Sequence, residues 1–450
     1  MVKRTIILNA LSFILAIADF ITANAIDSLD IRYKLIGMGS LESGQVVTGE
    51  PNGSDLQQKK IWCQRSYADL GFQATVDERA NLFVVGESMV RYAWAQTKDA
   101  LDNDQPQYLF YPHHVEGSYS FGNIERPILT AGFGVFPFKY NPDVRNLGEY
   151  LYRTGTYPPT MSSEFDFPLA RLTGFRVESK PVDSLNLCAM LTMESEVIPL
   201  KDWGVSVLGD YTIGKSLTIG GGVFFSHLLS VNENLTTPKN NNLAPIDSAN
   251  PDSVYYTFRG TKLMGRIAFD PKPFIPWHFF GKNDLRLYSE VAVIGLENYP
   301  LYYEQLWRRV PIMAGLNLPT FWAVKKLLNL VSDKWASTFF NYSDVFSVEL
   351  EWYKWNYPNS YTYYVFNSQV PQPDDNTGYD YTQNQLKWSC YALKQLGKSF
   401  SLIGQVAFDH MRLESNAFQQ GQAYFGDAMH KHGDWAWMLK MRFDLPEKSF

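Results

Sequence analysis

Apolar and polar side chains alternate along most of the chain from about residue 30 onward, in segments separated by turn residues. In the segment 346–352, apolar side chains occupy the even positions from Phe346 to Trp352, and the odd positions carry Ser347, Glu349 and Glu351. A period of two residues is that of a β-strand with one apolar and one polar face. Because the pattern recurs to the end of the chain, we expect an all-β protein.

We place about sixteen segments of this kind, a number of strands typical of a large barrel. Their approximate ranges are 29–40, 61–76, 81–96, 106–122, 127–140, 168–179, 185–195, 202–212, 216–230, 254–269, 284–297, 307–318, 344–357, 380–395, 399–414 and 430–445. Connections after even-numbered strands are mostly tight, and those after odd-numbered strands are mostly long and polar, as at 41–60, 141–167, 232–254 and 358–380. Short periplasmic turns and longer external loops are typical of bacterial transmembrane barrels, so we predict a transmembrane antiparallel β-barrel of about 16 strands.

Charged positions on these strands should face the barrel interior, because Lys or Arg facing lipid at mid-bilayer costs about 2–4 kcal/mol. The predicted lumen-lining residues are Arg65, Asp69, Glu87, Arg91, Glu349, Glu351, Lys440 and Arg442. The first four lie on one predicted hairpin, where their opposite charges could pair as a ladder. Two interpretations stay open, a polar channel wall or structural salt bridges that fill a narrow barrel. Sixteen strands favour the channel, since barrels of that size usually enclose an aqueous lumen.

Residues 1–25 match a cleaved signal peptide. Lys3 and Arg4 precede an apolar stretch from Ile6 to Ala18, and Ala23-Asn24-Ala25 is a small-x-small cleavage site. The apolar stretch is too short for a membrane-spanning anchor, which needs about 20 apolar residues. Residues 26–450 should then form one domain, the barrel.

Composition supports a membrane barrel over a soluble β-sandwich. Aromatic residues make up 15% of the chain, with 27 Tyr and 12 Trp, while the mean hydropathy is still −0.22. Strands that show one face to lipid and the other to water give this mixture. The net charge of −6 argues against a nucleic-acid partner, which normally requires a basic patch.

The segment 320–337 breaks the two-residue period. Phe321, Val324, Leu328 and Val331 fall mostly on one face of a helix, which predicts an amphipathic helix. It could contact the membrane surface or a partner, or it could pack under or into the barrel mouth. Packing is favoured, because apolar stripes are usually part of a core.

No constellation of residues in the sequence indicates catalysis. The chain has neither a Gly-x-Ser-x-Gly elbow nor a His-Glu-x-x-His motif. His113-His114 and His430-Lys431-His432 could bind a surface metal ion, but two histidines without an accompanying set of carboxylates are a weak signal. We therefore expect no enzymatic activity, no cofactor and no metal.

The connection 141–167 should carry specificity. Asn141 can cap a helix, Pro142 suits its first position and Gly155 its stop, so we expect a short helix within this loop. On that helix Arg145, Glu149 and Arg153 would be spaced four apart on one face.

The strand layout, the place of this loop and the Gly-x-Phe-Pro stretch at Gly134–Pro137 resemble the Gram-negative porin superfamily of outer-membrane barrels. In sixteen-stranded porins the third external loop folds into the barrel and narrows the pore. The resemblance implies that Arg145, Glu149 and Arg153 are candidates for the constriction, or else belong to a helix packed among the external loops. It also leaves a homo-oligomer open.

We therefore expect an outer-membrane channel for passive diffusion of small hydrophilic solutes, in contact with outer-membrane lipid. The alternative is a structural or adhesive barrel that acts through its external loops.

Overall fold

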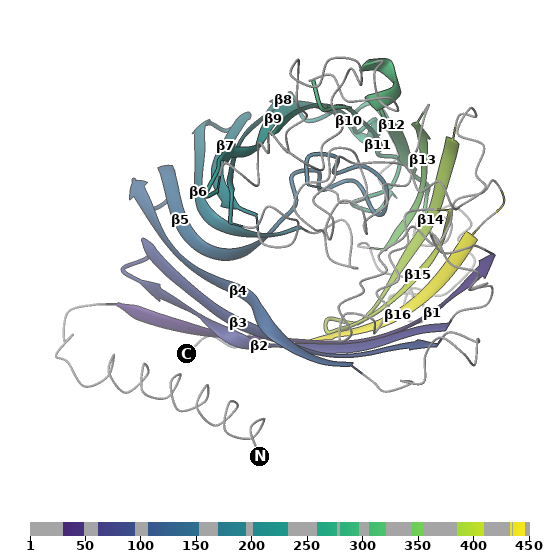
Figure 1. Ribbon diagram of the computed structural model, residues 1–450, viewed down its shortest axis with the longest axis horizontal. Helices are drawn as coiled ribbons and strands as arrows, with labels where there is room; N and C mark the ends of the chain where they lie inside the picture. Colours follow the sequence, from purple (N-terminus) through teal and green to yellow (C-terminus); the bar gives the residue numbers. More distant parts are fainter. Residues whose placement is uncertain are drawn as a thin grey trace, which may run out of the picture.

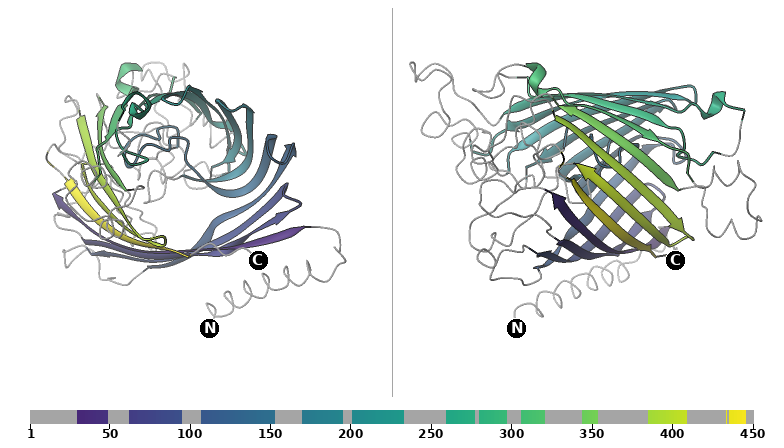
Figure 2. Two further views of the ribbon diagram at one scale, coloured as in Figure 1. Left: turned by 180° about the vertical axis from the view of Figure 1, so that it is seen from behind. Right: turned by 90° about the vertical axis from the view of Figure 1, so that its right-hand side faces the viewer.

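In the computed structural model the chain forms a closed antiparallel β-barrel (Figure 1). The structure describes residues 30–48, 62–94, 107–152, 170–194, 201–232, 259–276, 280–296, 306–320, 344–353, 385–408, 433 and 435–445. Within them each strand pairs with its neighbours in the sequence, and β1 closes the ring by pairing with β16. The strands cross the barrel at a tilt, as Figure 2 shows in side view.

The described residues contain sixteen strands. They are β1 (Ile31–Thr48), β2 (Trp62–Val76), β3 (Ala80–Trp94), β4 (Gln107–Gly122), β5 (Pro127–Phe138), β6 (Ala170–Val182), β7 (Leu185–Met193), β8 (Trp203–Ile213), β9 (Leu217–Leu229), β10 (Gly260–Phe269), β11 (Leu287–Ile294), β12 (Ile312–Asn317), β13 (Val345–Tyr353), β14 (Gln385–Leu396), β15 (Phe400–Phe408) and β16 (Trp435–Asp444). Two short 3₁₀ helices, η1 (Lys272–Phe274) and η2 (Leu306–Arg309), lie in connections. The predicted strand number and fold class are confirmed.

Several predicted strand bounds differ from the observed ones; the strand expected at 307–318, for example, spans only Ile312–Asn317. β1 continues to Thr48, so the first eight residues of the expected connection 41–60 are strand. Gly44 and Gln45 pair with β2 on one side and β16 on the other. The polar residues Ser43 and Gln45 hid the strand, because they occupy the outer face with Leu41 and so interrupt the apolar row on which the strand assignment depended.

Three-residue turns join several consecutive strands. Residues 77–79 connect β2 to β3, 214–216 connect β8 to β9, and 397–399 connect β14 to β15. Gly214 and Gly397 have φ of +61° and +81°, a backbone conformation that costs glycine little. Because these connections are so short, the following strand must pair antiparallel with the preceding one.

The two faces of the barrel have the polarity expected of a membrane barrel. Large apolar side chains stand exposed on the outside, among them Leu70, Phe133, Val207, Ile219 and Leu350. Side chains of alternate positions are directed to the interior and are buried, including Glu42, Arg65, Lys262, Glu349 and Lys387. This is the reverse of the arrangement in a water-soluble protein, where charged groups are almost never fully buried unless paired.

Some predictions fall outside the described residues. These are the signal peptide at 1–25, the amphipathic helix at 320–337 except Thr320, and the second half of the connection 141–167. Among the described residues there is no helix that is long and apolar enough to cross a membrane.

Candidate functional site

The connection after β5 folds into the barrel. Figure 1 shows its chain inside the ring of strands, on the side of β8 to β13. Val144, Leu147, Tyr150 and Leu151 are fully buried. We call the described part, residues 139–152, the inner loop.

The inner loop packs on an apolar patch of the barrel wall. The patch is made by inward-facing side chains of β6 to β12, namely Leu172, Met190, Leu208, Phe224, Met264, Ala268, Tyr288, Ala292, Ile294 and Met313. The alternation of apolar and polar positions predicted that polar and charged residues face the interior. On this side of the barrel, apolar side chains face the interior as well. The reason is that the inner faces of these strands carry apolar side chains beside the charged ones, and the apolar side chains pack on the loop.

Glycine allows the loop to lie close to the wall. A Cβ atom on Gly222 of β9 would be 3.1 Å from Leu151 Cδ1 and 3.1 Å from Leu208 Cδ2. Gly222 belongs to the Gly220-Gly221-Gly222 run, which is in the middle of a strand, where glycine often marks the close approach of another backbone.

A carboxylate on β13 binds three consecutive backbone amides of the inner loop. Glu349 accepts hydrogen bonds from the N–H groups of Arg145 at 2.5 Å, Asn146 at 2.8 Å and Leu147 at 2.8 Å. The Tyr288 hydroxyl also donates to it, at 2.8 Å. Successive N–H groups that point to one anion form a concave anion-binding turn, and here the anion is supplied by the barrel wall.

A second carboxylate, on β11, holds the two ends of the inner loop together. Glu290 accepts from the Tyr140 hydroxyl at 2.6 Å and the Asn141 side-chain amide at 2.8 Å. It also accepts from the N–H groups of Glu149 at 3.2 Å and Tyr150 at 2.9 Å. Hydrogen bonds to a charged group contribute about 1.5–3 kcal/mol each, so the two carboxylates fix the loop strongly.

Further contacts secure the rest of the loop. The Tyr150 hydroxyl donates to Glu351 at 2.8 Å, and Lys262 Nζ donates to the Tyr150 carbonyl at 3.1 Å. Asp143 forms an ion pair of 2.6 Å with Arg286. The loop therefore has wall partners along most of its described length.

The helix predicted from Asn141 is absent from the described residues 141–152. Gly148 and Glu149 both have positive φ, +88° and +57°, which a right-handed helix cannot contain. As a result, Arg145 and Glu149 do not share a helical face. Glu149 is buried, and its carboxylate accepts a 2.5 Å hydrogen bond from the Asn141 N–H. Arg145 is partly exposed, and Arg153 lies outside the described residues.

Burial changes the titration of two inner-loop side chains. It raises the pKa of Glu149 well above the ordinary value, and the charge of Glu290 raises it further. It also lowers the pKa of Lys139 to about 8, although Glu149 and other carboxylates oppose this shift. The inner loop thus carries ionisable groups that respond to pH outside their usual ranges.

The opposite side of the barrel has a row of buried charges across three strands. Glu42 of β1 lies between Arg65 of β2, at 2.9 Å, and Lys440 of β16, at 2.9 Å. The strand register places the same three residues directly opposite one another. Arg65 and Lys440 also approach the ring of Tyr67, with 5.0 Å and 4.9 Å to its centroid. Sequence analysis missed Glu42 because it fell in the part of β1 that was taken for a loop.

In the hairpin of β2 and β3, oppositely charged residues of the predicted ladder are not directly opposite one another. The register sets Arg65 opposite Arg91 and Asp69 opposite Glu87, so like charges face each other. Among the described side chains, ion pairs reach the strands on either side, as with Arg65 to Glu42 and Glu87 to His113. Cross-strand register depends on the turn, and a hairpin can place like charges opposite one another when neighbouring strands supply the countercharges.

Of the other predicted lumen residues, some are buried in the barrel interior and one is exposed near a barrel end. Glu349 and Glu351 are buried and contact the inner loop, as described above. Lys440 is buried, whereas Arg442, two residues along the same inward row, is exposed and paired with Asp444 at 2.7 Å. The side chain of Arg91 is outside the described part of the structure.

No protein family and no curated protein matches the sequence. Among solved structures, one variant of the Rh. blastica porin is 9% identical, with a TM-score of 0.42, over 93% of this chain and 100% of that one. A second variant is 10% identical, with a TM-score of 0.41, over 92% and 100%. At this level of similarity, the porin-like architecture of the chain rests on its own strand order, a closed antiparallel ring from β1 to β16.

Proposed function

We propose that the protein is an outer-membrane channel through which small hydrophilic solutes diffuse passively. The observation that carries the proposal is the inner loop, which is held inside the barrel by Glu290 and Glu349. A loop bound to the wall on one side narrows the interior without needing to fill it, because a sixteen-stranded barrel usually encloses an aqueous channel.

The exterior of the barrel supports a membrane location. Its exposed apolar side chains recur on strand after strand, for example Leu35, Phe175, Leu263 and Leu439. Soluble monomers rarely expose contiguous apolar patches of more than a few hundred Å². A bilayer would cover this surface, so outer-membrane lipid is the proposed partner.

The interior supports a hydrophilic solute of small size. The inner wall also carries paired charges of both signs, with Glu42, Arg65 and Lys440 in one row and Glu116 and Arg176 in another, paired at 2.9 Å. Charges that are paired with the opposite sign make the interior polar without selecting one sign of ion strongly. The proposal therefore includes no catalytic step.

Planar-bilayer recording of the folded protein tests the proposal. We expect discrete conductance steps, and we expect liposomes containing the protein to swell in solutions of small sugars but not of large ones. Absence of both, from protein whose migration on a gel changes on heating as a folded barrel's does, would overturn the proposal. That result would favour a closed barrel that acts through its external loops.

A further inference from the structure

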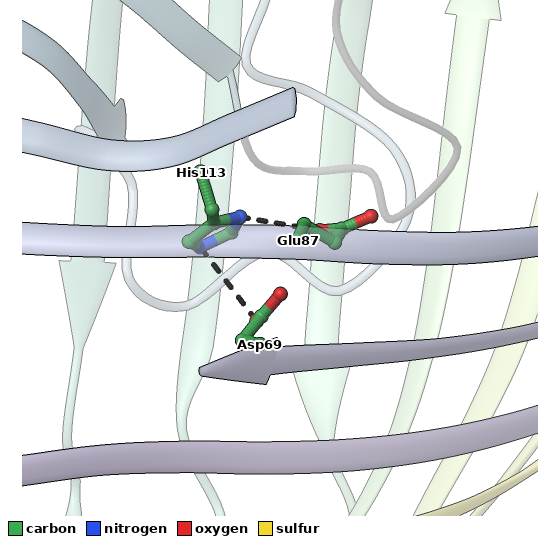
Figure 3. A group of neighbouring side chains, drawn as sticks. All are labelled: Asp69, Glu87 and His113. Atoms are coloured by element: carbon green, nitrogen blue, oxygen red, sulfur yellow. Dashed lines mark ion pairs between the residues drawn. The ribbon is translucent and has the colours of Figure 1, made fainter. Parts of the chain in front are cut away.

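Three side chains with metal-binding atoms converge on the inner wall of the barrel. Asp69 of β2, Glu87 of β3 and His113 of β4 each offer one ligand atom, and these atoms all lie within 4.8 Å of one another. Figure 3 shows one ring nitrogen of His113 directed to Glu87 and the other to Asp69. His113 Nδ1 is 3.2 Å from Glu87 Oε2, and Nε2 is 4.0 Å from Asp69 Oδ2.

A β-bulge in β4 places His113 in the cluster. Gly86 pairs with Pro112 and Val85 pairs with His114, so His113 is an extra residue without a cross-strand position. Bulges redirect side chains and are common beside functional sites. Here the bulge lets both His113 and His114 reach interior carboxylates, His113 at Glu87 and His114 at Glu116, 2.9 Å away.

Two carboxylates of the cluster lie close together in the buried interior. Asp69 and Glu87 are directly opposite in the β2–β3 register, an arrangement that is destabilising for two like charges. Their side chains are only 6% and 3% exposed, so water screens their repulsion poorly. Arg171 supplies positive charge on one side, with its guanidinium 3.9 Å from Glu87 and stacked over the Tyr111 ring.

We propose that Asp69, Glu87 and His113 bind a divalent transition-metal ion of the zinc class. One imidazole nitrogen and two carboxylate oxygens are ligands that Zn²⁺ accepts, and a three-residue set leaves a fourth position for water. Bonds of roughly 2.0–2.1 Å require ligand atoms about 3.4 Å apart at a tetrahedral centre. The proposed site therefore requires side-chain rotation that brings these atoms, now within 4.8 Å of one another, closer together. The Tyr111 hydroxyl donates a hydrogen bond to Glu87 and would orient this carboxylate.

Metal binding is tested on the purified, folded protein in detergent after treatment with EDTA. Titration with ZnCl₂ in a calorimeter should show one ion bound per chain, and Co²⁺ should give the visible absorption of a low-symmetry site. Substitution His113→Asn should weaken Zn²⁺ binding by at least the roughly 10- to 100-fold that loss of a ligand's hydrogen-bond partner costs. The matched control is His114→Asn, which changes the adjacent histidine and should leave binding unchanged.

A second variant keeps the test decisive if a ligand substitution prevents folding. Tyr111→Phe retains all three ligands and should weaken binding by roughly 10- to 100-fold. The proposal is overturned if the wild type binds no Zn²⁺, or if His113→Asn and His114→Asn bind it equally. Binding in detergent does not require conduction, so this result is independent of the proposed channel function. If the barrel conducts, Zn²⁺ should also alter the conductance of the wild type and not that of His113→Asn.

Discussion

Glu349 accepts a hydrogen bond of 2.5 Å from the backbone N–H of Arg145, and not from its guanidinium group. Arg145 was expected at a channel constriction and Glu349 on the lumen wall, both as charged side chains. The structure gives them different roles, because the carboxylate of Glu349 fixes the backbone of the segment that carries Arg145. The position of the inner loop is therefore set by charges on the barrel wall.

Replacing Glu349 with glutamine should release the inner loop. The neutral side chain presents an NH₂ group to amide donors, and each lost hydrogen bond to a charged acceptor costs about 1.5–3 kcal/mol. We expect a higher and noisier single-channel conductance than in the wild type. Asp444→Asn, at an exposed carboxylate on the barrel end, is the control and should conduct as the wild type does. Equal conductance in all three proteins would contradict the anchoring role.

Filling the space at Gly222 should displace the inner loop from the apolar patch of the barrel wall. A valine there would meet Leu151 and Leu208, whose atoms lie 3.1 Å from the position of a Cβ atom. Overpacking of this kind typically costs about 1–3 kcal/mol. Gly404→Val is a matched control, because no atom lies within 4 Å of a Cβ at that position. Limited proteolysis should cut the inner loop faster in Gly222→Val only, and equal rates would show that close packing at Gly222 is unimportant.

Rising pH should loosen the inner loop through Glu149. The pKa of its buried carboxyl is raised well above the ordinary value of 4.5, so the docked loop binds more protons than the released loop once pH exceeds that value. Docking is then strongest in acid and weakens as pH rises toward the raised pKa. Lys139 has the opposite effect, and only above its lowered pKa of about 8, where it loses its buried charge.

Conductance measured between about pH 5 and pH 7.5 separates the two groups, because Lys139 stays charged over that range. The wild type should conduct more at the upper end, and Glu149→Gln should respond less to pH. An unchanged pH response in Glu149→Gln would assign the effect to another group, such as Glu290.

Neutralising Glu42 should destabilise the whole barrel. Glu42→Gln leaves Arg65 and Lys440 buried without their shared carboxylate, and breaking a buried pair in this way costs about 3–5 kcal/mol. Unfolding in urea from lipid vesicles measures the loss.

The matched comparison for Glu42 is Arg442→Gln, which breaks an exposed ion pair with Asp444 and should cost about 0–1 kcal/mol. Restoring part of the stability with the double variant Glu42→Gln, Lys440→Met would confirm that uncompensated charge causes the loss. Equal stability of the two single variants would contradict it.

The sequence by itself determined the strand number, the antiparallel order and the direction in which most side chains face. These follow from a two-residue period and from short turns, and both are properties of neighbouring residues. Glu349 and Glu351 were correctly placed on the inner face in this way. Where polar residues interrupt the apolar row, as at Ser43 and Gln45, the same signal ended too early.

Only the tertiary structure decided which interior groups meet. Glu349 and Leu147 are 202 positions apart in the chain, and their hydrogen bond depends on the curvature of the closed ring. The partner of Arg65 depends on register, which places Arg91 opposite on one side and Glu42 on the other. His113 reaches Glu87 and Asp69 across two strand pairings and a bulge. Contacts of this kind are set by long-range pairing and packing, and a local pattern of residues does not contain that information.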